Sequence, residues 1–490
     1  MNQTGCRDCQ IDGVGVVRGA LIGDIAVFRG IPFAAAPVGL QRFRPPEPAP
    51  SWRGVRDTTG VAPIAPQTPS RVLRQMGAIE APQSEDCLSL TIWKPDRTMA
   101  PLPVVVWLHG GGFSTGGGAL PWYEGIHLAR AGLVVVGVNY RLGALGFLSI
   151  PGTLPGNLAL LDQLAALDWV KDHIADLGGD PSLVTVMGQS GGGHNIASML
   201  TLPASSGLFC RAILQSVPLG IGLMSAQDAG KRADAFLNAL GLRGSTAHLI
   251  DELRSAPVSE ILRAQTEAAQ TLGNMTPGDL RPPFTPTVLE PHSPHGDFTM
   301  QAATAAAARR VEILIGWTRE EANLFLADLP QVTGLSTATL ESLAGKIYGT
   351  DSAPMLDQVR GRRPQAEAPQ LFMDLVGDAN LRLPSMSFAH AVAGSGGRVF
   401  VYQFDWASPQ PQLGACHCLE LPFVFGTLAA FENAPLLQGA DVSITGMLSR
   451  EMMRRWVQFI KTGDPGFPAW QGASQPIYHF DVESRLEYTA

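Results

Sequence analysis

A chain of 490 residues with 45% hydrophobic and 16% charged residues is long enough to bury a large core, as expected of a globular protein. Its formal net charge is −8 and it contains no basic run, so nucleic-acid binding has little electrostatic support. No apolar run reaches the roughly 18 residues of a membrane-spanning helix. Composition and charge therefore argue against a nucleic-acid-binding or membrane-spanning protein.

The N-terminus and the six cysteines bear on the compartment. Residues 1–6 have neither the basic nor the apolar region of an export signal. Six cysteines in a chain of this length do not form a disulfide framework. Cys6 and Cys9 have the spacing of a zinc or redox pair, but no second Cys-x-x-Cys accompanies them, which favours an ordinary reduced segment. We therefore expect a cytoplasmic protein with reduced cysteines.

The first hundred residues show the pattern of short antiparallel strands. Val14–Leu21 and Ile25–Arg29, separated by residues 22–24, predict an N-terminal antiparallel hairpin. Residues 60–85 carry no clear period, and we interpret them as a loop over the surface. Leu88–Trp93 predicts another strand.

From Pro103 onward, buried strands alternate with helices, which predicts a large, mostly parallel sheet flanked by helices on both faces. Ala159–His173 shows the clearest helical spacing, and Arg450–Thr462 predicts a final amphipathic helix. Residues 226–264 and 336–375 are predicted helical insertions in a single α/β domain that covers residues 1–490. The predicted strands are Val104–Leu108, Leu133–Val138, Leu183–Met187, Ala212–Gln215, Val311–Ile315 and Val399–Phe404.

Between one of these strands and a helix lies Gly188-Gln189-Ser190-Gly191-Gly192. A Gly-x-Ser-x-Gly at this point can form a nucleophile elbow, a sharp turn that exposes the serine hydroxyl above the sheet. The pattern alone is also compatible with a glycine-rich turn. Further upstream, the predicted strand Val104–Leu108 runs into His109-Gly110-Gly111-Gly112-Phe113. Consecutive glycines let backbone N–H groups converge on an oxyanion, and the expected donors are Gly111, Gly112 and Gly191.

These and other segments resemble the type-B carboxylesterases, an α/β-hydrolase family that includes bacterial p-nitrobenzyl esterases and the cholinesterases. The resemblance covers nearly the whole chain. It implies the α/β-hydrolase fold, hydrolysis of small-molecule carboxylic esters, and no metal or organic cofactor. The segments that carry it are residues 28–34, 37–39, 84–90, 109–113, 139–143, 157–163, 188–192 and 213–216.

The resemblance also implies the partners of Ser190. The family's acid segment matches Gly316-Trp317-Thr318-Arg319-Glu320-Glu321-Ala322, and its alignment favours Glu321 over the adjacent Glu320, although Ala322 replaces the usual glycine. The family's histidine segment matches residues 414–426 and makes His417 the general base. The resulting order Ser190, Glu321, His417 is that of α/β-hydrolases. Ser216 matches a serine that lies close to the triad in the family, a weaker assignment.

Several positions depart from the family pattern. Gln189 stands where a glutamate is more common, and two cysteines, Cys416 and Cys418, flank His417 and are interpreted as packing residues. Cys87 has no cysteine partner near residue 66 and is expected to be a buried free thiol, while Arg42 and Glu85 match a structural ion pair. Met76-Gly77-Ala78 replaces the tryptophan that binds choline in cholinesterases, so a choline ester specialist is not expected.

The main prediction is therefore a serine carboxylesterase, present as a monomer or homodimer. The same machinery could instead act on carbamates or anilide-type amides, and the sequence does not separate these substrates. A catalytically inactive interaction domain is a remote alternative, because Ser190, Glu321 and His417 are all present.

Overall fold

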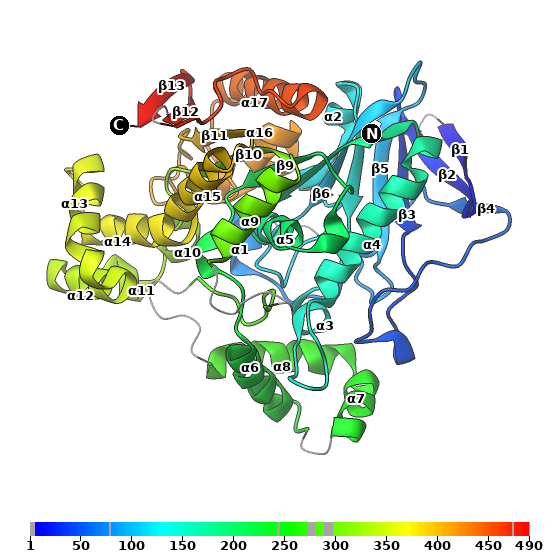
Figure 1. Ribbon diagram of the computed structural model, residues 1–490, viewed down its shortest axis with the longest axis horizontal. Coiled ribbons are helices and arrows are strands. Elements are labelled where there is room, and N and C mark those ends of the chain that lie inside the picture. The colour runs from blue at the N-terminus through cyan, green and yellow to red at the C-terminus, as the bar shows by residue number, and fades with distance from the viewer. Residues whose placement is uncertain are drawn as a thin grey trace.

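The computed structural model describes residues 5–77, 80–242, 246–272, 280–288, 297–472 and 475–489. In these residues a single mixed sheet runs through the molecule in the order β1-β2-β3-β5-β7-β6-β8-β9-β10-β11-β12-β13, with β4 beside β2 (Figure 1). The first strands are β1 (Gly5–Ile11), β2 (Gly15–Ile22), β3 (Ile25–Pro32), β4 (Val55–Asp57), β5 (Ser89–Pro95) and β6 (Leu102–Leu108). The remaining strands are β7 (Val134–Val138), β8 (Gly179–Gln189), β9 (Arg211–Gln215), β10 (Glu312–Thr318), β11 (Val399–Phe404), β12 (Gln475–Phe480) and β13 (Arg485–Thr489).

The centre of the sheet is parallel, from β7 through β6, β8, β9, β10 and β11 to β12. Its N-terminal edge is antiparallel, and β2 with β3 forms the predicted hairpin. The prediction of a mostly parallel sheet with an antiparallel N-terminal hairpin is thus confirmed. The hairpin continues into β1, which pairs with β2 along its whole length. Cys6 and Cys9 therefore lie on an edge strand, and both are free thiols.

Alternate residues of the parallel strands enter two different hydrophobic clusters, one on each face of the sheet. Val104 and Val106 of β6 face the first cluster, whereas Val105 and Trp107 face the second. Residues buried on both faces explain why these strands read as continuous apolar runs. The first cluster is covered by α4 (Leu158–His173), α5 (Gly191–Leu200), α9 (Phe298–Ala308) and α15 (Leu383–Gly394). The second is covered by α2 (Ile126–Arg130), α16 (Leu421–Phe425) and α17 (Val442–Thr462).

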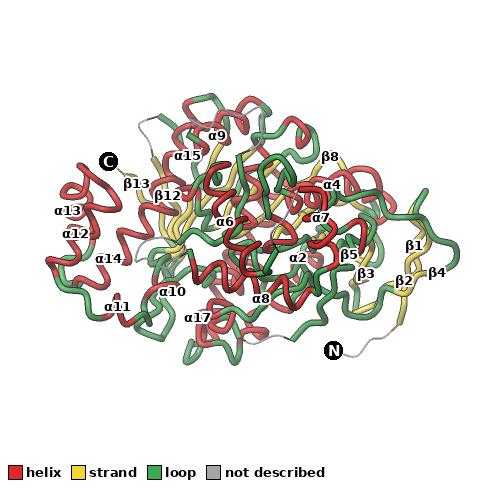
Figure 2. Tube along the Cα trace, turned by 90° about the horizontal axis from the view of Figure 1, so that it is seen from below, coloured by secondary structure: helices red, strands yellow, loops and turns green. Residues whose placement is uncertain are grey.

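Two groups of helices extend beyond this three-layered centre (Figures 1 and 2). Between β9 and β10 lie α6 (Ala226–Ala239), α7 (Thr246–Ser255) and α8 (Val258–Thr271). Between β10 and β11 lie α10 (Asn323–Leu326), α11 (Pro330–Thr333), α12 (Thr337–Tyr348), α13 (Ser352–Arg362) and α14 (Ala368–Gly377). The second group has a small hydrophobic cluster of its own, which includes Leu340, Val359 and Phe372.

The helix that leads back from this second group contains a wider turn. Helix α14 continues through a π-helical stretch, Asp378–Arg382, directly into α15. Pro384 in the first turn of α15 has no amide hydrogen to donate to the carbonyl four residues earlier, and a π-turn accommodates such a gap. The stretch therefore joins two α-helices that are out of register with each other.

The interpretation of residues 60–85 as a surface loop is wrong in part. Ser70 caps a short helix, α1 (Arg71–Gln75), by accepting a hydrogen bond from the backbone N–H of Leu73. Met76 follows the helix and is 1% exposed. A helix of five residues has too few positions to show a period, so no pattern in the sequence indicates it.

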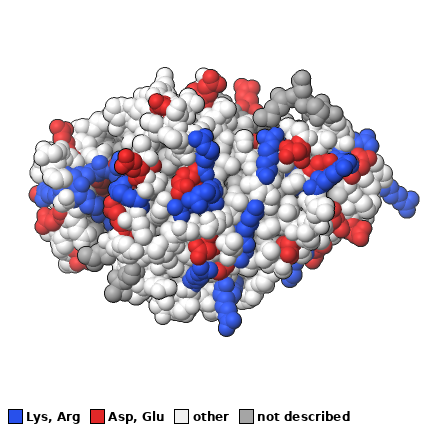
Figure 3. Space-filling view, turned by 90° about the horizontal axis from the view of Figure 1, so that it is seen from above, with Lys and Arg blue, Asp and Glu red and all other residues white. Residues whose placement is uncertain are grey.

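Other expected features are observed. Cys87 is a buried free thiol, and Arg42 forms a two-pronged ion pair with Glu85 at 2.6 Å. Basic and acidic side chains are interspersed on the surface shown in Figure 3. None of the described helices combines the length and apolar character needed to cross a membrane.

Candidate active site

The parallel register brings the predicted site segments to one edge of the sheet. Leu108 at the end of β6 pairs with Gly188 of β8, and Gln189 pairs with Gln215 of β9. Gln215 in turn pairs with Gly316 of β10. The loops that follow these strands therefore start side by side, at the carboxyl ends where ligands bind in open α/β sheets.

Ser190 lies in the turn between β8 and α5 with φ 53° and ψ −123°, a conformation that non-glycine residues rarely adopt. Its backbone N–H donates to the Gln215 carbonyl at 2.9 Å, which fixes the turn to the neighbouring strand. The turn is possible because of glycine, since a Cβ on Gly192 would come within 2.0 Å of the Leu108 carbonyl oxygen. The sequence motif thus forms the strained strand-to-helix turn of a nucleophile elbow.

The glycine loop after β6 lies against this turn. Gly111 and Gly112 have φ of 113° and 59°, and a Cβ on Gly111 would lie 2.1 Å from the Thr115 carbonyl oxygen. Gly191 is the first residue of α5, so its N–H has no acceptor within the helix. All three glycines line the same cavity as Ser190.

His417 comes from the segment between β11 and α16 and is 2% exposed. Its Nδ1 lies 2.5 Å from Glu321 Oε2, and the other oxygen of Glu321 accepts a hydrogen bond from the backbone N–H of Thr318 at 2.8 Å. Burial lowers the pKa of His417, but the neighbouring Cys418 and the Glu321 carboxylate outweigh it and raise the pKa above the ordinary value of 6.5. The pair is thus a carboxylate-oriented imidazole, the arrangement that a general base requires.

The adjacent carboxylate, Glu320, has different partners. It accepts hydrogen bonds from Arg319 at 2.6 Å, from Arg363 and from the backbone N–H of Ala415 at 2.6 Å. Glu320 therefore joins the segment that carries His417 to the helices between β10 and β11, whereas Glu321 contacts the imidazole itself.

Ser216 follows β9 and is fully buried with φ 47°. Its backbone N–H donates to the Gly316 carbonyl at 2.8 Å. No partner for its hydroxyl is found among the described residues. The structure thus places Ser216 at the same sheet edge as Ser190 without joining it to His417 or Glu321 by a hydrogen bond.

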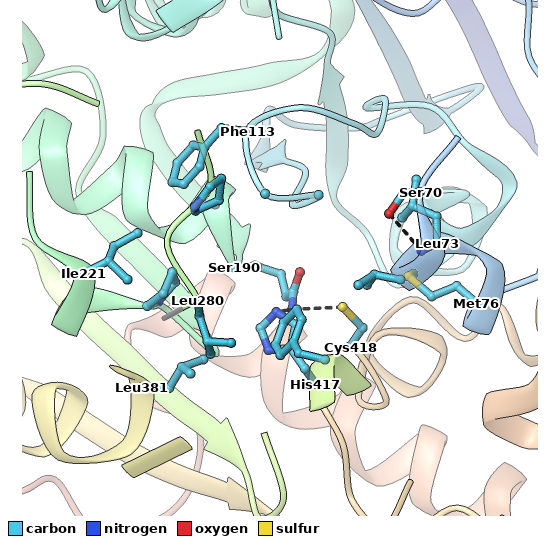
Figure 4. A pocket seen from close by; sticks show the side chains of 18 of the residues that line it. Ser70, Leu73, Met76, Phe113, Ser190, Ile221, Leu280, Leu381, His417 and Cys418 are labelled. Atoms are coloured by element: carbon cyan, nitrogen blue, oxygen red, sulfur yellow. Dashed lines mark hydrogen bonds between the residues drawn. The ribbon is translucent and has the colours of Figure 1, made fainter. Parts of the chain in front are cut away.

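The cavity above Ser190 has a volume of about 150 Å³ and an apolar wall (Figure 4). Phe113, Ile221, Leu280 and Leu381 lie on one side of Ser190 and His417, and Leu73 and Met76 lie on the other. Among the described residues that line it there is no aspartate, glutamate, lysine or arginine. Sequence reasoning missed the contributions of α1, of Phe325 and of Leu381 from the π-helical stretch, because nothing in their local pattern links them to Ser190.

Three buried polar groups surround His417 in addition to Glu321. The Gln189 amide nitrogen lies 3.0 Å from His417 Nε2 and 3.3 Å from the sulfur of Cys418. Cys418 has φ 70° and lines the cavity, whereas Cys416 packs into the second hydrophobic cluster. Glu420 accepts a hydrogen bond from Gln215 at 3.3 Å, and its burial, followed by the nearby Glu321, raises its pKa to about 7.

Comparison with known proteins agrees with this geometry. Residues 8–486 match the model of the carboxylesterase family. The chain belongs to this family. Carboxylesterase relatives include the para-nitrobenzyl esterase of Bacillus subtilis (strain 168), which is 36% identical over 96% of this chain and 93% of its own length. A probable N-octanoylanthranilate hydrolase of Rhodococcus erythropolis is 38% identical over 93% of both chains.

A solved carboxylesterase structure, a PNB esterase, superposes with a TM-score of 0.84 at 33% identity and covers 98% of this chain and 97% of its own. The protein therefore has the α/β-hydrolase fold, and the predicted family and fold class are confirmed. Family and relatives together make the chain a carboxylic ester hydrolase.

Proposed function

We propose that this protein hydrolyses small-molecule carboxylic esters through an acyl-enzyme on Ser190. The observation that carries the proposal is that the serine elbow, the glycine loop and the imidazole–carboxylate pair all lie at one cavity. A serine in a strained elbow and three glycines line one cavity, and the His417–Glu321 pair adjoins that cavity. Each part occurs by itself in other proteins, but together they supply a nucleophile, a base and an oxyanion site.

In the proposed mechanism, neutral His417 takes the proton of Ser190 as the serine oxygen attacks the ester carbonyl. The N–H groups of Gly111, Gly112 and Gly191 stabilise the tetrahedral oxyanion. Glu321 holds the proton on Nδ1, so Nε2 is the atom that accepts the serine proton and then donates it to the departing alcohol. Water repeats the sequence on the acyl-enzyme and frees Ser190.

The apolar wall of the cavity supports an uncharged, apolar substrate, since a charged group would lose its hydration there without gaining a counter-ion. One observation favours a second candidate reaction. The Rhodococcus relative is named for an N-acylanthranilate, which is an anilide-type amide, and this supports hydrolysis of such amides by the same residues. We expect a cytoplasmic monomer or homodimer, and Ser216 to support the site without touching the substrate.

The test is turnover of p-nitrophenyl acetate by the wild type and by Ser190→Ala. The wild type should hydrolyse the ester, and the variant should lose a factor of roughly 10⁴–10⁶ in kcat, because no other group can form the acyl-enzyme. A folded Ser190→Ala variant with wild-type activity would refute the assignment of the nucleophile.

A panel of p-nitrophenyl esters from acetate to decanoate, with one phenylcarbamate and one anilide, separates the two candidate reactions. Higher kcat/KM on the esters supports the main proposal. Higher kcat/KM on the carbamate or the anilide would replace it with the second.

A further inference from the structure

The side chain of Gln189 occupies the side of His417 that a nucleophile needs. Gln189 is the last residue of β8 and is 1% exposed. Its amide nitrogen lies 3.0 Å from His417 Nε2 and 3.3 Å from Cys418 Sγ, and Figure 4 draws the bond that ends on this sulfur. Within the described part of the chain, His417 has two side-chain partners besides Glu321, namely Gln189 at Nε2 and the adjacent Cys418, and no hydrogen bond joins the side chains of Ser190 and His417.

The donor in this contact follows from the other side of the ring. Nδ1 faces the Glu321 carboxylate at 2.5 Å and therefore carries the proton. In a neutral imidazole Nε2 is then a bare acceptor, so the group 3.0 Å away must be the amide N–H. The amide oxygen lies beside Gly110, where a Cβ would come within 2.5 Å of it. The glycine loop and the imidazole together hold the amide in one orientation.

We propose that Gln189 is a positioning residue that favours the neutral form of His417 in the free enzyme and gives up Nε2 to Ser190 when substrate binds. The proposal rests on the function proposed above. An amide N–H can donate to a neutral imidazole but not to an imidazolium, whose Nε2 is itself a donor. Gln189 therefore opposes protonation of the free enzyme and must release Nε2 before that atom accepts the serine proton. A glutamate, which is more common at this position in the carboxylesterase family, would instead stabilise the imidazolium through its negative charge.

Other titratable groups near His417 also affect its protonation. Cys418 and Glu321 favour the imidazolium, and Glu420, with its pKa raised to about 7, gains charge in the same pH range. Burial raises the pKa of each of the remaining groups, which are therefore uncharged at neutral pH. These groups are Cys416, Tyr123 and Tyr402. A test must therefore remove the amide and leave the carboxylates unchanged.

Gln189→Met is such a variant, because it keeps the length of the side chain and removes the donor. The readouts are the pH profile of kcat/KM for p-nitrophenyl acetate and the pH dependence of inactivation by phenylmethylsulfonyl fluoride, both of which report the free enzyme. Loss of a donor to the neutral imidazole should move the acid limb of both profiles up by about 0.5–1 pH unit. Above the limb, kcat/KM should equal or exceed that of the wild type, because Nε2 is open to Ser190.

Gln163→Met is the matched control. Gln163 is a fully buried glutamine on α4 that does not line the cavity, and its amide has no partner in the described residues. This variant should leave the acid limb in place. Gln189→Asn, whose shorter amide cannot reach Nε2, should reproduce the upward shift and serves if the methionine variant does not fold. Cys418→Ala removes a neighbour that raises the pKa of His417, so it should move the acid limb down, opposite to the Gln189 variants.

An acid limb that stays in place in a folded Gln189 variant would overturn the proposal, whether kcat/KM falls at all pH values or does not change. A uniform fall would mean that Gln189 only supports the structure of the site. Failure of the wild type to turn over the ester or to react with the sulfonyl fluoride would instead refute the proposed function, so the two failures are distinguishable.

Discussion

Glu320 and Glu321 show how two neighbouring side chains of one type can have separate tasks. The Glu321 carboxylate contacts His417, whereas Glu320 accepts hydrogen bonds from two arginines and a backbone amide. The two carboxylates are nearly equally buried, at 3% and 4% exposed, so burial does not distinguish them. Their hydrogen-bond partners do.

Replacing each carboxylate by its amide should therefore have different effects. Glu321→Gln should lower kcat by roughly 10³–10⁴-fold with little loss of stability, because the imidazole is no longer held in the productive tautomer. Glu320→Gln should keep most of the activity and lower the free energy of unfolding by about 1–3 kcal/mol. This loss is smaller than that expected for a fully buried ion pair, because Arg319 and Arg363 are partly exposed to solvent. Steady-state kinetics and urea unfolding of both variants check this. A larger loss of kcat in Glu320→Gln would reverse the assignment.

At this scale the resemblance names Ser190, Glu321 and His417 by motif, and the structure places Ser190 and His417 on one cavity with Glu321 bonded to the imidazole. The sequence did not indicate that Gln189 contacts Nε2 or that Cys418 lines the cavity. Those contacts depend on side-chain torsions and on the meeting of segments more than 220 residues apart, and neither is encoded in a local pattern.

At the scale of the elements, α5 begins in close contact with the end of β6. Gly188, Gly192 and Leu108 approach so closely that a Cβ on Gly192 has no room, whereas a Cβ on Gly191 would meet its nearest atom, the Phe113 nitrogen, at 3.3 Å. The glycines of the motif therefore differ in purpose. Gly192 allows the helix to approach the sheet, whereas Gly191 lines the cavity, where we propose that its N–H binds the oxyanion.

Alanine at the two positions should separate these purposes. Gly192→Ala should lower the free energy of unfolding by about 3 kcal/mol, because backbone atoms of β6 would have to move. Gly191→Ala should stay within about 1 kcal/mol of the wild type, since its neighbours need to shift by only a few tenths of an ångström. Urea unfolding measures both. Equal stability of the two variants would contradict the close approach of α5 to β6.

Long elements were predictable and short ones were not. The parallel strands and α4 have enough buried positions for a clear pattern, and the structure has them within a few residues of the predicted bounds. Strands β1 and β4, in contrast, are partly or fully exposed edge strands with few apolar residues, and α1 has a single turn. Strands β1 and β4 form because they pair with β2, and α1 forms where it packs against the cavity. The residues that they contact lie elsewhere in the chain, so a local pattern does not reveal these elements.

At the scale of the whole molecule, the two large hydrophobic clusters sandwich the sheet, whereas α11–α14 surround a separate small cluster. Ion pairs of Arg363 with Asp374 and Glu320, and of Arg71 with Asp328, join these helices to each other and to the rest. We propose that the chain is one α/β domain in which this group of helices is the least stable part.

Amide hydrogen exchange should show this difference. Amides of α12 and α13 should exchange at a lower opening free energy than those of β6, β8 and β9, because few buried contacts oppose their local opening. Exchange followed by mass spectrometry of peptic peptides measures it, with α4 as an internal reference helix. Equal protection of α12, α13 and the central strands would contradict a separate small core.

The π-helical stretch Asp378–Arg382 has a consequence for how the substrate cavity can evolve. Leu381 of this stretch lines the cavity, while Phe388 of α15 is fully buried in the core. Each residue of an α-helix turns the next side chain by about 100°, so deleting or inserting one residue here would rotate one of these two side chains away from its place. Exchanging the side chain at position 381 can therefore change the size of the cavity and leave the core intact. A change in the length of this helix would instead displace Leu381 from the cavity or Phe388 from the core.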